Sequence, residues 1–300
     1  MRIGIDLGGT KIEAIALAPD GATRFSARVA APRGDYDATI RAVVDLVASA
    51  ERAIGERGHV GIGIPGTLSP ASGVVKNANS TWLNGRPLDI DLARALGRPV
   101  RLATDANCFA LSEATDGAAA RARAVFGVIL GTGTGGGIVV GGELLVGRNA
   151  IGGEWGHNAL PWPDADEWPG PACYCGRRGC IETFLSGSGL QSAYGVADGR
   201  SARDIAEAAQ AADVRARAAL DVYTRRVAKA LASVINLIDP DVIVLGGGLS
   251  NIESLYREVP GQWGGWVFSD RVDTALRRAQ HGDASGVRGA AWLWPESAIE

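Results

Sequence analysis

The chain has 300 residues, enough for one large or two medium domains, and its hydrophobic (46%) and charged (21%) fractions are ordinary for a globular protein. A net charge of −3 gives no electrostatic basis for binding nucleic acid or an anionic membrane surface. The sequence contains no run of about 18 apolar residues and its start does not resemble a signal peptide, so we expect a cytoplasmic protein without membrane contact.

The chain opens with an apolar stretch that runs into a glycine turn, MRIGIDLGGTK. We predict a strand over Ile3–Leu7, in which Asp6 needs a partner because an isolated buried carboxylate is costly. The turn Gly8–Thr10 can bring backbone N–H groups and a hydroxyl to a phosphate, although an ordinary hairpin turn is the alternative. Strands over Ile12–Ala18 and Ala22–Ala31 then complete an antiparallel meander.

The following segments predict alternating helices and strands. Apolar residues at helical spacing indicate a helix over Asp37–Ile54, with Asp37 as its N-cap. The apolar stretch Val60–Ile64 is typical of a strand buried on both faces, and it leads into Gly66 at a sheet edge that can bind ligands. Three further elements are expected: a helix over Leu88–Leu96, a strand over Pro99–Ala103 that delivers Asp105, and a helix over Asn107–Thr115.

A polar, turn-rich stretch, Val74–Gly85, lies between these elements. It is either a solvated loop or a sugar-binding loop. In the second case the amides of Asn77, Asn79 and Asn84 would bind hydroxyls, and Trp82 would offer an aromatic face to a sugar ring.

The strand-and-glycine pattern then recurs. A strand over Ala124–Leu130 leads into the turn Gly131–Gly137, GTGTGGG, and strands follow over Ile138–Val140 and Glu143–Val146. Two meanders, each with a Gly/Thr first turn, predict two related lobes that face each other across a cleft.

The last part of the chain combines an irregular stretch with long helices. The proline-rich segment Gly152–Cys180 predicts irregular structure, which in a compact domain is usually functional or held by a staple. Helices are expected over Ser201–Ala211, Arg217–Ile238 and Gly286–Trp294. A buried strand over Val242–Leu245 runs into a third glycine turn, residues 246–248.

Three glycine turns after three apolar strands suit a nucleotide held between two lobes. Neither the pattern G-x-x-x-x-G-K-[ST] nor a helix-opening G-x-G-x-x-G occurs. The sequence therefore argues against both a Walker-type NTPase and a dinucleotide-binding Rossmann fold.

A second group of residues indicates a metal site. His157 precedes three of the chain's four cysteines, Cys173, Cys175 and Cys180, which fall within one short segment. One imidazole and three thiolates make a closed tetrahedral zinc site, which is structural because it leaves no open position. Three free buried thiols are the alternative. Zinc bound here would order the proline-rich loop.

A third group consists of the carboxylates Asp105, Glu154 and Glu182. The metal-bound loop would bring both glutamates near one point, although solvated surface acids are the common alternative. Phosphoryl transfer to an alcohol needs one carboxylate to accept the hydroxyl proton.

These motifs together resemble the ROK family of bacterial sugar kinases over nearly the whole chain. The matching stretches are Gly4–Lys11, Gly61–Gly66, Asp105–Cys108, Gly131–Gly137, Glu154–His157, Cys173–Glu182 and Leu245–Asn251. Asn77–Gly85 is most similar to the fructokinase, or mannokinase-type, branch. Asp105–Glu113 and His281–Ala291 are similar to the N-acetylglucosamine kinase branch.

The resemblance implies the α/β actin/hexokinase-like (ribonuclease H-like) ATPase fold, with two lobes, a central cleft and a zinc-stapled loop. We expect an N-terminal lobe over 1–117, joined by the final helix at about 285–300, and a C-terminal lobe over 118–284. The implied cofactors are ATP, Mg²⁺ and structural Zn²⁺. The implied partners are a free sugar and ATP, without nucleic acid or membrane, in a homodimer.

The family's functional residues carry over to matching positions of this chain. Asp105 matches the catalytic base, and Asp6 is the expected magnesium-side acid. The expected nucleotide-binding residues are Gly4, Ile5, Asp6, Leu7, Gly8, Gly9, Thr10, Lys11, Gly131, Thr132, Gly133, Thr134, Gly135, Gly136, Gly137, Ile138, Gly247 and Gly248. The expected sugar-binding residues are Gly66, Asn79, Thr104, Asp105, Glu154, His157 and Glu182. The expected zinc ligands are His157, Cys173, Cys175 and Cys180, with His157 serving sugar and metal through different ring nitrogens.

The resulting prediction is a kinase that phosphorylates the 6-hydroxyl of a hexose, with D-fructose as the first choice and mannose or glucose as others. Thr104 stands where the family usually has asparagine, which bears on the choice of hexose. N-acetylglucosamine or N-acetylmannosamine kinase is the alternative. A sugar-sensing regulator is more distant, because Asp6 lies too near the start for a preceding DNA-binding segment. A chaperone-like or cytoskeletal ATPase fits less well with the zinc loop.

Overall fold

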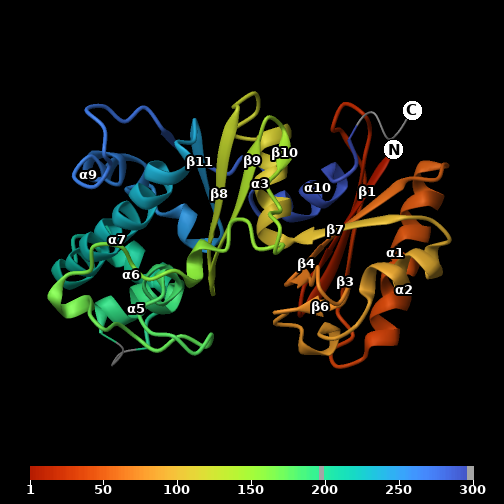
Figure 1. The fold of residues 1–300 in the computed structure, drawn as a ribbon, viewed down its shortest axis with the longest axis horizontal. Coiled ribbons are helices and arrows are strands. Elements are labelled where there is room, and N and C mark those ends of the chain that lie inside the picture. Colours follow the sequence, from red (N-terminus) through yellow and green to blue (C-terminus); the bar gives the residue numbers. More distant parts are fainter. Residues whose placement is uncertain (196–198, 296–300) are drawn as a thin grey trace.

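The computed structural model describes residues 1–195 and 199–295, and it forms two five-stranded sheets flanked by helices (Figure 1). The first sheet has the strand order β3–β2–β1–β4–β7. Its strands are β1 (Arg2–Leu7), β2 (Lys11–Leu17), β3 (Thr23–Ala30), β4 (His59–Ile64) and β7 (Val100–Thr104). The predicted meander β1–β2–β3 is antiparallel, and β4 and β7 extend it as parallel strands.

The second sheet repeats this topology, with the order β10–β9–β8–β11–β12. Its strands are β8 (Ala124–Leu130), β9 (Thr134–Val140), β10 (Glu143–Leu144), β11 (Val242–Gly246) and β12 (Ala275–Arg278). Again three strands form an antiparallel meander and two more are parallel. The shared order agrees with the prediction of two related halves. The edge strand β12 was not predicted.

Two helices lie between the sheets and join them (Figure 1). They are α3 (Asp105–Thr115), which contacts β8 and β9, and α10 (Ser285–Trp292), which contacts β1 and β4. The two helices also contact each other extensively. On the outer side of the first sheet, α1 (Tyr36–Ile54) and α2 (Leu88–Leu96) cover a hydrophobic core built on β1, β2 and β4.

The second sheet is covered by a larger helical layer. Its helices are α4 (Ile181–Leu185), α5 (Gly187–Tyr194), α6 (Ala202–Gln210), α7 (Val214–Ile238), α8 (Leu255–Glu258) and α9 (Pro260–Trp263). Their buried side chains form one core with β8 and β11. Short elements complete the fold: the ribbon β5 (Thr67–Leu68)–β6 (Val75–Lys76) and 3₁₀ turns that include Thr81–Leu83 and Trp155–His157.

Several element boundaries differ from the prediction. Helix α1 is capped by Asp35, whose side chain accepts the Ala38 N–H, so Asp37 is not its N-cap but lies in its first turn. Helix α7 starts at Val214 instead of Arg217, because Asp213 caps it. The segment Gly131–Gly137 is a turn only at its start, since β9 begins at Thr134.

The predicted division of the chain at residues 117 and 118 remains a prediction, and residues 296–300 of the expected final segment lie outside the described residues. Among the described residues, no helix has the length and apolar character needed to cross a bilayer.

Close backbone approach explains why the first sheet carries glycines opposite α10. A Cβ at Gly61 in β4 would lie 1.8 Å from the Ala290 carbonyl oxygen. We expect Gly61→Ala to lower the free energy of unfolding by about 3 kcal/mol, because the helix must move away from the sheet. Urea denaturation measures this. Gly261→Ala is the control, since a Cβ there meets no atom within 4 Å. Equal stability of the two variants would contradict the packing argument.

Candidate active site

A cavity of about 860 Å³ is lined by residues from both halves of the fold. It contains all the predicted sugar-binding residues, Gly66, Asn79, Thr104, Asp105, Glu154, His157 and Glu182, and a third of the predicted nucleotide-binding residues, Gly131, Thr132, Gly133, Thr134, Gly135 and Gly136. The fold thus brings segments that are far apart in the chain together around one cleft.

Asp105 is the first residue of α3 and directly follows β7. The helix starts two residues earlier than predicted because the Thr104 hydroxyl oxygen caps it, accepting the Asn107 N–H at 3.1 Å. Asp105 Oδ1 accepts the Ala106 N–H at 2.7 Å, which fixes the carboxylate. Burial raises the pKa of Asp105, Ala106 opposes the rise and the Glu154 carboxylate adds to it. A desolvated, oriented carboxylate at a cleft is suited to accept a proton.

The second glycine turn, at Gly131–Thr134, is hydrogen-bonded to one of the three predicted carboxylates. Glu182 Oε2 accepts the Thr134 N–H at 3.0 Å, so this carboxylate holds the end of the turn. A Cβ at Gly133 would lie 2.6 Å from the same oxygen. Gly137 and Ile138 were predicted as part of this site but lie further along β9. Gly137 has a packing role there, because a Cβ would lie 2.6 Å from the Ala106 carbonyl oxygen.

The first turn and the third turn lie outside the residues that line this cavity. In the first turn, the Gly8 N–H donates to the Lys11 carbonyl at 3.0 Å, which closes the β1–β2 hairpin. The strand residues before it, Gly4, Ile5 and Leu7, are buried. In the third turn, Gly247 has φ +79° and closely approaches the Leu130 carbonyl. Gly248 begins a 3₁₀ turn.

Asp6 lies close enough to Asp105 for the negative charge of that cleft carboxylate to affect it. Burial raises its pKa from 3.8 to about 6, and the negative charges of Asp105 and Glu13 add to this rise. A carboxylate at this depth is suited to lie opposite a cation, which would return it to the ionised form.

The raised pKa of Asp6 predicts a pH-dependent stability. Because the folded protein favours protonated Asp6, its ionisation costs stability as the pH rises from about 4 through about 6. We expect Asp6→Asn to gain stability relative to the wild type between pH 4 and pH 7, by roughly 3 kcal/mol at most. Urea denaturation of both proteins at each pH measures the gain. A difference between them that does not change with pH would contradict this assignment.

The predicted metal ligands form a compact group. The ligand atoms of His157, Cys173, Cys175 and Cys180 all lie within 4.8 Å of one another. Cys173 Sγ is 3.6 Å from His157 Nδ1, and Cys175 Sγ is 3.6 Å from Cys180 Sγ. Four ligands at zinc–sulfur distance from one tetrahedral ion are about 3.8 Å apart, so this group fits zinc.

The polar stretch after β6 has two functions. Asn77 and Asn79 line the cleft, as does Thr81. Asn84 instead holds the loop together, because its side-chain amide accepts the Ala78 N–H and donates to the Ala78 carbonyl. The Trp82 indole donates to Thr39 and packs beside the first core. The sugar-binding alternative is therefore not supported for Trp82 and Asn84, because both side chains hold local structure.

Thr67 and Tyr174 are among the lining residues that were not predicted from the sequence. Thr67 follows Gly66 in β5, and Tyr174 stands between two predicted zinc ligands. The only sequence signal for either residue was that its neighbours in the chain were predicted site residues: Gly66 for Thr67, and two zinc ligands for Tyr174.

Comparison with known proteins shows which family has this architecture. The ROK family profile matches residues 2–297. The N-acetyl-D-glucosamine kinase of Escherichia coli O1:K1 is 40% identical over 299 residues, covering 98% of this chain and 99% of that protein. The fold superimposes on a ROK hexokinase from Thermus thermophilus with a TM-score of 0.85, at 34% identity and with coverage of 97% of this chain and 96% of that one.

A ROK family glucokinase from Streptomyces griseus, solved with glucose and AMPPNP, superimposes with a TM-score of 0.77 at 29% identity. The match covers 97% of this chain and 98% of the glucokinase. The predicted hexokinase-like α/β fold is thereby confirmed. The chain belongs to the ROK family.

Proposed function

We propose that this protein is an ATP-dependent sugar kinase that phosphorylates the 6-hydroxyl of N-acetylglucosamine. The observation that carries the proposal is the single cleft that is lined by Asp105, the Gly131–Thr134 turn and the carboxylates Glu154 and Glu182. The similarity to N-acetylglucosamine kinases along the full chain supports this sugar, the alternative in our prediction, better than fructose.

In the proposed reaction, Asp105 accepts the proton of the attacking sugar hydroxyl. The Ala106 N–H holds Oδ1, so Oδ2 is the oxygen directed to this task. Burial makes the carboxylate more basic than in water, which favours proton transfer. Glu154, His157, Glu182 and Asn79 would bind the other polar groups of the sugar. The Thr104 hydroxyl oxygen caps α3 by accepting a hydrogen bond, so its proton is left to donate to the sugar.

The backbone N–H groups of Gly8–Thr10 and Gly131–Thr134 are proposed to bind the ATP phosphates, with Gly247 and Gly248 near the nucleotide. Mg²⁺, when bound, would neutralise phosphate charge, and Asp6 is the proposed acid beside it. The depth of Asp6 and its coupling to Asp105 support this placement.

A substrate panel tests the proposed sugar. The kcat/KM values for N-acetylglucosamine, N-acetylmannosamine, glucose, mannose and fructose are compared on the purified protein with ATP and Mg²⁺. We expect N-acetylglucosamine to exceed fructose by at least about tenfold, since one well-placed group contributes about 1.4 kcal/mol of discrimination. A preference for fructose would favour the original prediction of a fructokinase.

We also propose that His157, Cys173, Cys175 and Cys180 bind one structural zinc ion that fixes the loop carrying Glu154. Elemental analysis should find about one zinc per chain. Cys175→Ser is expected to lose most of the zinc, because serine is a poor ligand for it. Cys108→Ala is the matched control, as this cysteine lies away from the group. Equal zinc content in both variants would contradict the site.

A further inference from the structure

Tyr174 is placed unusually for an exposed aromatic residue. The residue is 76% exposed, yet its hydroxyl lies 2.9 Å from His157 Nε2. The two rings meet edge to face, with centroids 5.1 Å apart and an interplanar angle of 85°. Because both neighbours of Tyr174 belong to the compact cysteine group, its backbone is held in place next to the cleft.

The environment of His157 assigns a direction to this hydrogen bond. His157 Nδ1 is turned toward Cys173 Sγ, on the side of the proposed metal ligands. An imidazole that uses Nδ1 as a ligand carries its proton on Nε2 and can only donate from that nitrogen. With Nδ1 on the proposed zinc ion, Nε2 donates to the oxygen of Tyr174.

The N–H group at Nε2 is also the donor that His157 would offer to a ligand in the cleft. Tyr174 and His157 both line the cavity that contains Asp105, Glu154 and Glu182. The three acids lack donors when ionised, so a neutral sugar oxygen finds few donor groups on this side of the cleft. A single N–H cannot make two strong bonds, so a sugar oxygen and the tyrosine oxygen compete for it.

We propose that Tyr174 is a displaceable cap on His157, which a sugar oxygen, either a hydroxyl or an acetamide carbonyl, must replace in order to bind. The proposal rests on the proposed function, because it takes His157 as a sugar-binding group. It makes Tyr174 a specificity-determining residue. A sugar with an acceptor oxygen at this point releases the cap, whereas a sugar without one binds against an intact tyrosine–histidine bond.

Tyr174→Phe tests the cap, because it removes the competing oxygen and keeps the ring. A net hydrogen bond contributes about 0.5–1.5 kcal/mol, which corresponds to a factor of about 2 to 12 in affinity. We expect the KM for the preferred sugar and its Kd measured by calorimetry without ATP to fall by about that factor. The kcat and the KM for ATP should stay unchanged.

Trp168→Phe is the matched control, because Trp168 is similarly exposed on the same loop but lines a different cavity. Zinc content equal to that of the wild type shows that the loop is intact in both variants. An unchanged sugar Kd in Tyr174→Phe would overturn the cap, and a weaker Kd would overturn it in favour of direct sugar binding by Tyr174. Failure of the wild type to phosphorylate any sugar would instead overturn the proposed function.

Discussion

Asp105→Asn is expected to lower kcat at least about a hundredfold, the range for loss of a general base. The amide has the shape of the carboxylate and can still accept the Ala106 N–H, which in the wild type is 2.7 Å from Oδ1. It cannot accept the proton of the sugar hydroxyl. A coupled assay for ADP release measures kcat, and calorimetry measures whether the sugar still binds.

The substitution should lower kcat without lowering the stability of the fold. Removing a carboxylate whose pKa is raised in the folded protein does not destabilise the fold at neutral pH, so the free energy of unfolding should not fall. Glu143→Gln, on the exposed part of β10, is the control and should keep full activity. Turnover close to the wild type in folded Asp105→Asn would refute the role of Asp105.

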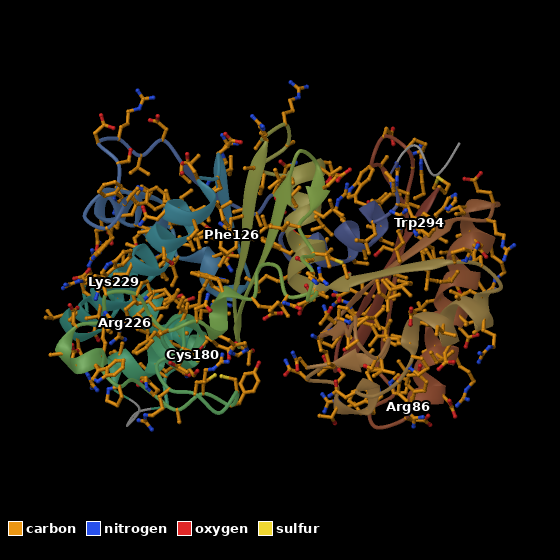
Figure 2. The ribbon with its side chains drawn as sticks, viewed as in Figure 1. Arg86, Phe126, Cys180, Arg226, Lys229 and Trp294 are labelled. Carbon is orange, nitrogen blue, oxygen red and sulfur yellow. The ribbon has the colours of Figure 1, made fainter. Side chains whose placement is uncertain are left out.

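Lys229→Met is expected to produce a large loss of stability. Lys229 lies on α7 with its side chain 1% exposed, and its Nζ donates to Asp164 and Glu167, each at 2.9 Å. Both acids belong to the irregular loop that also carries the proposed zinc ligands. Figure 2 shows Lys229 and Arg226 on α7, in the same half of the molecule as Cys180. This cluster of ion pairs therefore holds the loop in place independently of the proposed zinc ion.

Breaking a buried ion pair costs about 3 to 5 kcal/mol. We expect the lower end for Lys229→Met, because Arg226 still pairs with Glu167 at 2.8 Å and Arg225 with Asp164 at 3.3 Å. Burial alone would raise the pKa of Glu167, but the hydrogen bonds from Arg226, the Asp164 N–H and Lys229 lower it. The cluster therefore stabilises the folded protein at pH values above the ordinary pKa of glutamate. This stabilisation is lost as the pH falls and Glu167 becomes protonated.

Urea denaturation at neutral pH measures the change. Arg203→Met is the matched control, because it breaks an exposed pair with Glu207 on α6 and should cost less than about 1 kcal/mol. If both variants lost equally little, the loop would not depend on the buried cluster.

The sequence predicted those parts of the site that follow from local pattern. Asp105 was found because a predicted strand ends just before it, and the Gly131 turn because glycine and threonine follow an apolar strand. The cysteine group was found because its members lie close in the chain. The repeated strand order could be anticipated because each meander is local.

Other features depend on contacts between distant segments. Lys229 looks like a surface residue of an amphipathic helix until Asp164 and Glu167 fold over it. The short helix α5 and the edge strand β12 have weak local patterns and depend on the core that they join. The sequence left the role of Trp82 open because its partner, Thr39, lies on another helix. The homodimer remains a prediction.

Phosphorus NMR of the reaction mixture tests the central claim, sugar phosphorylation by this chain, most directly. With ATP, Mg²⁺ and N-acetylglucosamine, we predict that the γ-phosphate signal is replaced by equal amounts of ADP and a sugar 6-phosphate monoester, and that Asp105→Asn forms almost none. Release of inorganic phosphate without a phosphorylated sugar, for every sugar of the panel, would contradict the account.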